Sequence, residues 1–222
     1  MNYQERLCRS FVFLTEKMIM KDITVEELRS KLDGRPIGVV GKRKEFAVLI
    51  PLIEEDGEVK LLFEVRSKDV RQPGDVCFPG GKIEEGETET EAALREMAEE
   101  TGVGPEYVEV LGRFDSVLEV NRIRMHTAVG LMKEGWREQL DPDGEVAEIF
   151  TVPLKFFKET EPDYYKGRII QDTEGFPYEK HGINPEYKWR DAWQDIFFWH
   201  WEGHTIWGLT AAIVQWMTEV LL

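Results

Sequence analysis

Several short runs of the chain are rich in apolar and β-branched residues, a pattern that predicts β-strands. The run 46–53 is followed by the hairpin signal Asp56-Gly57, and 59–65 returns as its partner strand. Shorter runs of the same kind extend this series, and they are 76–78, 108–117, 124–131 and 196–201.

Other stretches carry helix signals. Thr24 followed by Glu27 is a capping box that opens a helix over 25–32. A charged helix is expected over 90–101, and an amphipathic one over 207–221. A short helical patch surrounds 154–158. Strands mixed with helices predict an α/β sandwich, in one domain that covers 23–222.

Two segments show neither pattern. Residues 1–22 have no clear period and are expected to form a loosely ordered extension. Residues 159–195 are rich in Pro, Gly, Tyr and charge, and we expect them to form a long irregular excursion from the domain.

Composition narrows the classes of partner. The net charge of −15 repels nucleic acid and acidic membranes, so neither is expected as a partner. A phosphate-bearing substrate then needs a local positive charge, which a bound cation would supply. No apolar run has transmembrane length, and charges scattered through the first 20 residues break a secretory pattern, so the cytoplasm is the expected location. Cys8 and Cys77 are expected to be reduced thiols.

The helix predicted over 90–101 concentrates carboxylates on one face. At about 100° per residue, Glu96, Glu99 and Glu100 fall within an arc of about 100°. Such carboxylates repel one another, and hard cations such as Mg²⁺ or Mn²⁺ relieve the repulsion. A solvated acidic face is the alternative, and the three glutamates alone favour it.

The spacing around these glutamates favours the metal site. Gly81, Glu87 and the run Arg95-Glu96, Met97, Glu99-Glu100, Gly102, Val103 match the Nudix box at every defined position. A chance match is on the order of one in a million. The chain therefore resembles the Nudix hydrolase superfamily. The resemblance implies an α/β/α sandwich with a mixed sheet, and hydrolysis of a nucleoside diphosphate linked to another group.

The resemblance also implies roles for single residues. Glu96, Glu99, Glu100 and the backbone carbonyl of Gly81 would hold Mg²⁺ or Mn²⁺, and Glu87 would support them. Arg95, Glu99 and Glu100 are candidates for catalysis, because the metal ions activate a water and a carboxylate can act as general base.

The segment before the box, 61–81, is similar to the coenzyme A pyrophosphatase branch. It contains the branch's paired leucines, Arg66-Ser67, Arg71, Gly74 and the run Phe78 to Gly81. The spacing from Arg71 to Gly74 is one residue shorter than usual, and the threonine after the leucines is missing. The resemblance implies hydrolysis of coenzyme A to 4'-phosphopantetheine and 3',5'-ADP.

A basic turn fits this substrate. Arg66, Lys68 and Arg71 cluster before the metal helix, and arginine forks suit phosphate oxygens. We take these three as substrate-binding residues, with a solvated basic turn as the alternative.

Outside the box, Glu145 is the first candidate for an extra ligand or base, followed by Glu148, with a charged helix start as the alternative for each. His200 and His204 have zinc-like spacing, but Glu202-Gly203 indicates a turn between them. The aromatic run from Phe197 to Trp207 is more typical of a core or a homodimer interface than of a base-stacking platform. Aromatics that could line a substrate pocket on the excursion are Tyr164, Tyr165, Phe176 and Tyr178.

Three other functions stay open. The chain could be a Nudix hydrolase of ADP-ribose or a nucleoside triphosphate. It could be a sensor that binds a nucleotide without cleaving it, although the complete glutamate set argues against that. It could be an isomerase with the same fold, to which the Arg66-Ser67 segment does not point.

Overall fold

The computed structural model describes residues 23–35, 40–41, 43–119 and 122–222. Its contacts divide the chain into two compact units, Met1–Gly41 and Lys42–Leu222. The first unit contains α2 (Val25–Leu32), which has the predicted capping box between Thr24 and Glu27. The division after residue 41 lies later than the predicted start of the domain. The extension expected over 1–22 falls outside the described residues.

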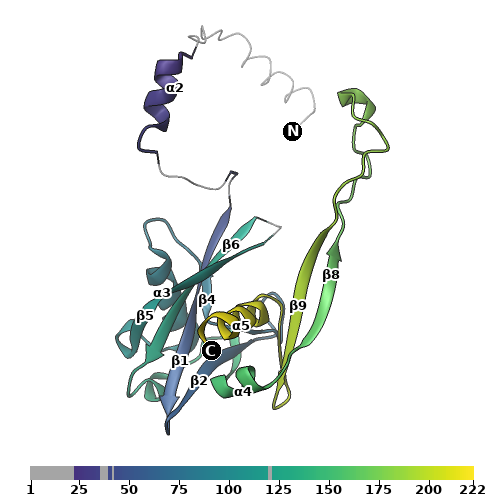
Figure 1. Cartoon of the computed structure of the whole chain (residues 1–222). Helices are drawn as coiled ribbons and strands as arrows, with labels where there is room; N and C mark the ends of the chain where they lie inside the picture. Colours follow the sequence, from purple (N-terminus) through teal and green to yellow (C-terminus); the bar gives the residue numbers. More distant parts are fainter. Residues whose placement is uncertain (1–22, 36–39, 42, 120–121) are drawn as a thin grey trace. The chain divides into compact units, whose positions relative to one another are not determined.

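The second unit is built on a mixed sheet (Figure 1). The strand order is β3-β2-β1-β6-β5, with β4 also paired to β1 and β7 to β2. β1 and β6 run parallel, and the other pairs are antiparallel. The strands are β1 (Lys44–Glu55), β2 (Glu58–Arg66), β3 (Val76–Cys77), β4 (Gly80–Lys82), β5 (Val108–Leu118), β6 (Ile123–Met132) and β7 (Val146–Pro153).

One face of this sheet packs against α3 (Glu89–Thr101). Thr88 and Glu91 form a capping box at its start, and Gly102 ends it in the left-handed conformation, with φ of 81°. Ala92, Ala93 and Met97 are fully buried against the apolar side chains of this sheet face. The small alanines allow the helix to approach the strands closely.

The opposite face carries a larger core. Phe63 of β2, Phe157 of α4 (Leu154–Glu159) and Trp199 are each at most 2% exposed. α5 (Gly208–Leu221) covers this core through Ile213 and Val214. The sheet therefore lies between α3 on one side and α4 and α5 on the other, which confirms the α/β/α sandwich (Figure 1). No described helix has the length and apolarity needed to cross a membrane.

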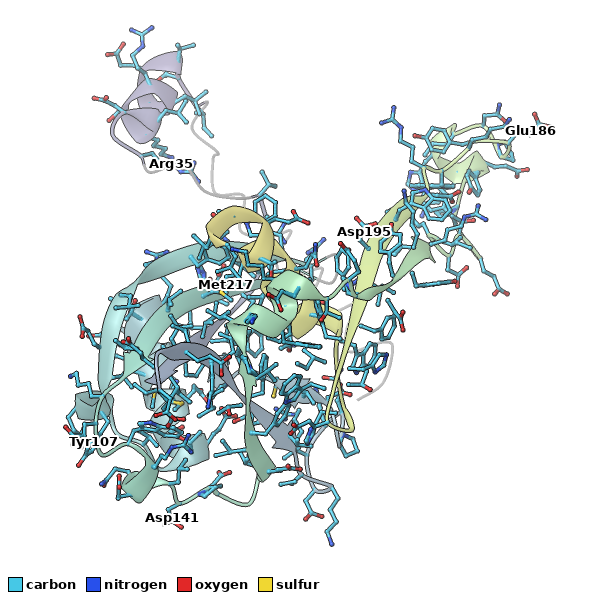
Figure 2. All side chains as sticks on the ribbon, turned by 60° about the horizontal axis from the view of Figure 1, so that its bottom comes forward. Arg35, Tyr107, Asp141, Glu186, Asp195 and Met217 are labelled. Atoms are coloured by element: carbon cyan, nitrogen blue, oxygen red, sulfur yellow. The ribbon has the colours of Figure 1, made fainter. Side chains whose placement is uncertain are left out.

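The prediction of an irregular excursion over 159–195 is wrong, because two strands of a second, three-stranded sheet lie wholly or partly in this segment. This sheet consists of β8 (Asp163–Ile169), β9 (Ala192–Trp201) and β10 (His204–Trp207), in the order β10-β9-β8. The β8–β9 ribbon extends away from the main sheet, and Figure 2 shows Glu186 at its far tip and Asp141 on the body. Within the expected excursion, residues 159–162 and 170–191 contain no strand.

The ribbon was missed because its strands bury little. Tyr164, Tyr165 and Trp193 are each more than half exposed, so the ribbon lacks the alternation of a half-buried strand. Its far end is held by ring contacts of Trp189 with Phe176 and Tyr187. Short 3-10 turns complete the described elements, and they are Pro105–Tyr107, Arg137–Gln139 and Glu179–His181.

Candidate active site

The backbone of β4 lies directly against the glutamate face of α3. Gly80 pairs with Val48 of β1, and a Cβ added to Gly80 would stand 2.6 Å from the Val48 Cα and overlap the Ala47 carbonyl. A Cβ added to Gly81 would overlap the Glu96 carboxylate. Gly80 is therefore required by close packing against the β1 backbone, whereas Gly81 lies against the flexible end of the Glu96 side chain.

Arg95 binds the carboxylates of the exposed part of this face. Its Nε and Nη2 donate to the two oxygens of Glu87, at 2.7 and 3.1 Å. Its Nη1 donates to Glu96 at 2.8 Å and to Glu99 at 3.0 Å, and Nη2 also reaches the Lys82 carbonyl at 3.0 Å. The hydrogen bond from Arg95 lowers the pKa of Glu87. One guanidinium thus offsets three carboxylates and fixes their orientation.

Glu100 is the buried member of the face. It is 6% exposed, and its Oε2 accepts a hydrogen bond from the Gly80 N–H at 2.7 Å. Burial, followed by the charge of Glu64, raises the pKa of Glu100 to about 8. Burial also raises the pKa of Glu96. The structure therefore places Glu96 and Glu99 around Arg95, and it places Glu96 and Glu100 against the Gly80-Gly81 backbone.

Glu64 of β2 lies beside this face, and no motif in the sequence marked it as a site residue. It is 1% exposed, its Oε1 accepts from the Cys77 thiol at 3.2 Å, and burial raises its pKa to about 7. Cys77 is a free thiol, as expected, and burial raises its pKa; Cys8 lies outside the described residues. The signal that could have found Glu64 is a lone carboxylate inside the apolar strand 61–65.

Of the three predicted substrate-binding residues, Arg66 is partly buried, and Lys68 and Arg71 are exposed. The positive charge of Arg66 offsets part of the rise in the pKa of Glu64 and Glu100, which burial causes first. Its Nε donates to the Arg71 carbonyl at 2.9 Å, and this bond helps to shape the turn. The side chains of Lys68 and Arg71 are exposed on that turn.

Glu145 lies near the site, in a loop rather than at a helix start. Its charge contributes to raising the pKa of Glu64. The Glu145 carbonyl accepts from the Ser67 N–H at 2.7 Å, and the Glu100 carbonyl accepts from the Asp143 N–H at 3.1 Å. The loop thereby ties the end of α3 to the basic turn. The charged helix start considered for Glu145 and Glu148 is wrong, because β7 begins at Val146.

Glu148 lies elsewhere. It pairs with Val65, on the face of the sheet that packs against α5, and its Oε2 lies 3.2 Å from His204 Nε2. Both line a cavity of about 620 Å³ with Phe198 and Trp207, whose rings stack at 6.1 Å. The aromatics expected to line a substrate pocket, Tyr164, Tyr165, Phe176 and Tyr178, do not line this cavity.

Strands β9 and β10 carry the paired histidines and the aromatic run. A turn at 202–203 separates His200 in β9 from His204 in β10, which agrees with discounting zinc. Trp199 is a core residue, whereas Trp207 is 42% exposed. The core interpretation of the aromatic run therefore holds for Trp199.

The donor set at α3 fits a hard divalent cation, since it consists of carboxylates and a backbone carbonyl. Among the described residues, no three His, Cys, Asp or Glu side chains are already arranged around an ion. Arg95 holds Glu96 and Glu99, and the Gly80 N–H holds Glu100. Each of these hydrogen bonds uses one carboxylate oxygen, so the second oxygen could bind an ion while the bond persists. The buried Oε2 of Glu64 has no hydrogen-bond partner among the described residues.

Comparison with known proteins identifies the family. A family model described as NUDIX domain matches residues 43–171, more than half of the chain. The chain belongs to the Nudix family. The match begins at the start of the main sheet and ends after β8, so it contains α3 and every predicted site residue.

Two relatives narrow the resemblance within the Nudix family. The mouse protein named peroxisomal coenzyme A diphosphatase NUDT7 is 39% identical over 134 residues, which cover 60% of this chain and 56% of that protein. The Caenorhabditis elegans protein named peroxisomal coenzyme A diphosphatase ndx-8 is 33% identical over 141 residues, covering 60% and 59%. The resemblance to the coenzyme A branch is confirmed, and the chain spans just over half the length of these relatives.

A solved structure of the same family is also similar. The Nudix hydrolase RenU from M. smegmatis has a TM-score of 0.45 and 23% identity, over 51% of this chain and 72% of that one.

Proposed function

We propose that this Nudix protein is a divalent-metal-dependent pyrophosphohydrolase that cleaves coenzyme A or its derivatives to 4'-phosphopantetheine and 3',5'-ADP. The observation that carries the proposal is the packing of a complete glutamate face on α3 against the Gly80-Gly81 backbone. Family membership and the names of the two relatives support the same reaction and substrate.

The site residues would have separate roles in hydrolysis. Glu96, Glu99, Glu100 and the Gly81 carbonyl would hold the cation, and Arg95 would position Glu96 and Glu99 through its hydrogen bonds. A bound Mg²⁺ or Mn²⁺ would neutralise phosphate oxygens and lower the pKa of the attacking water. We assign the acceptance of that water's proton to a carboxylate beside the cation. Glu145 is the candidate outside the box, because it is exposed next to Glu64.

The basic turn would bind the phosphates that do not react. Arg66 supplies a positive charge next to the buried carboxylates, where an anionic substrate must approach. Lys68 and Arg71, exposed on the same turn, would bind the 3'-phosphate of coenzyme A. Together with the cation, they would supply local positive charge for an anionic substrate on a chain whose net charge is −15.

Product analysis tests the proposal. The full chain is incubated with coenzyme A and Mg²⁺ or Mn²⁺, and the products are separated by chromatography, with a sample in EDTA as the control. We expect 4'-phosphopantetheine and 3',5'-ADP in equal amounts, and none in EDTA. A kcat/KM for ADP-ribose or a nucleoside triphosphate well above that for coenzyme A would transfer the assignment to that substrate. Binding without turnover would favour the sensor.

We retain the cytoplasm as the proposed location, a homodimer as the alternative to a monomer, and small molecules rather than nucleic acid or membranes as partners. The net charge supports the last point. Two relatives are named peroxisomal, so imaging of the tagged chain against cytosolic and peroxisomal markers is the direct measurement of location.

A further inference from the structure

Glu64 faces the same layer as the metal helix. Along β2, Leu62 belongs to the core cluster that contains Met97 of α3, and Phe63 belongs to the core on the opposite face. Because side chains alternate along a strand, Glu64 points to the α3 side, as Leu62 does. The strand therefore inserts one carboxylate under the helix that carries the box glutamates.

The two oxygens of Glu64 differ in their surroundings. Oε1 accepts from the Cys77 thiol at 3.2 Å, across the β2–β3 pair. Oε2 is buried and has no hydrogen-bond partner among the described residues, in a side chain that is 1% exposed. A buried carboxylate oxygen without a partner is costly, so its presence requires an explanation.

The groups around Glu64 increase that cost. The negative charges of Asp143 and Glu145 repel that of Glu64, and Glu64 in turn repels Glu100. Arg66 supplies the opposing positive charge. The Nε of Arg66 donates to the Arg71 carbonyl. Protein charges alone thus leave two buried carboxylates, Glu64 and Glu100, repelling each other.

We propose that Glu64 is a further ligand, supplied by β2, of the divalent cation held by α3. Its Oε2 would bind the ion, while the Cys77 thiol holds Oε1 and fixes the carboxylate's orientation. A cation bound there would offset the negative charges of Glu64 and Glu100 and would give the unpaired oxygen a partner. The inference rests on the proposed function, because it adds a ligand to the same metal site.

Mn²⁺ binding to the full chain tests this assignment without an activity measurement. The free Mn²⁺ signal in electron paramagnetic resonance gives affinity and stoichiometry for the wild type, Glu64→Gln and the control Glu109→Gln. Glu109 is exposed on β5, at the opposite edge of the sheet from β3, so its substitution makes the same chemical change away from the site. We expect Glu64→Gln to weaken Mn²⁺ binding at least about tenfold and Glu109→Gln to leave it unchanged.

Thermal unfolding adds a readout that a merely structural glutamate would not give. In EDTA, Glu64→Gln should unfold at a higher temperature than the wild type, because it removes a buried repulsion. With saturating Mn²⁺, its increase in midpoint should be smaller than that of the wild type. Glu64→Asp keeps the charge on a shorter side chain, so it should bind Mn²⁺ with intermediate affinity.

The outcomes separate this inference from the proposed function. Wild-type Mn²⁺ affinity in a folded Glu64→Gln variant, or in Glu64→Asp if the glutamine variant does not fold, would overturn the ligand assignment and leave the hydrolase proposal standing. A wild-type chain that neither binds Mn²⁺ nor cleaves coenzyme A would overturn both.

Discussion

The two faces of the main sheet differ in how deeply they bury acidic side chains. On the α3 face, Glu64 and Glu100 are buried next to each other, and burial raises the pKa of both. On the α5 face, Glu148 is half exposed and lies 3.2 Å from His204. The first arrangement costs stability and the second does not. This contrast teaches that the number of acidic residues is a poorer guide to a metal site than the cost of the position they occupy.

The strongest way to break this comparison is to remove one charge from each face. Glu100→Gln should lower kcat/KM for coenzyme A at least about 100-fold, since it takes a ligand from the site. Glu148→Gln makes the same change on the other face and should stay within about threefold. Steady-state assays with Mg²⁺ measure both. Near-wild-type turnover by a folded Glu100→Gln protein would refute the metal assignment of α3.

A smaller effect should come from the residue that orients the α3 carboxylates. Arg95→Lys keeps the charge but loses the fork that holds both oxygens of Glu87 and reaches Glu96 and Glu99. We expect kcat/KM to fall about 10- to 100-fold with the fold intact. Arg113→Lys is the control, because Arg113 forms a single ion pair with Glu89 at 3.3 Å. Equal activities for the two variants would contradict the positioning role.

The close approach of β4 can be tested by adding one methyl group. Gly80→Ala places a Cβ 2.6 Å from the Val48 Cα, so the strand must move away from β1. We expect a loss of about 1–3 kcal/mol in the free energy of unfolding, measured in urea. Gly144→Ala is the matched control, since nothing lies within 4 Å of its added Cβ. Equal stability of the two variants would show that the approach is less tight.

The last prediction concerns the pH dependence of stability in EDTA. The folded-state pKa values of Glu64 and Glu100, about 7 and about 8, lie above the ordinary value of 4.5. Raised carboxyl pKa values stabilise the fold at pH below the ordinary value, and this contribution is lost as the pH rises through 7 and 8. The melting temperature should therefore fall between pH 5 and 8, by about 2–4 °C for each kcal/mol lost. A flat profile would count against burial of the two carboxylates.

Much of the fold followed from local signals. The capping box of α2 and the apolar strand runs depend on neighbours within a few residues, so these elements matched their predictions. The β8–β9 ribbon was missed because strand pairing between distant segments leaves no local pattern when both faces are exposed. The box residues could be predicted because one helix carries them at regular spacing.

The sequence by itself determined the sandwich, the family resemblance and the shared face of Glu96, Glu99 and Glu100, because helical geometry converts spacing into position. Only the tertiary structure decided that Glu64 lies on the α3 side of the sheet and Glu148 on the other side. The pairing of β2 and β7 in the sheet sets these positions, and the distance along the chain from α3 does not. The tertiary structure also decided that Gly80 and Gly81 contact that helix. The sequence does not show which face of a sheet a strand glutamate occupies. Packing alone distinguishes a buried, unpaired carboxylate from a solvated one.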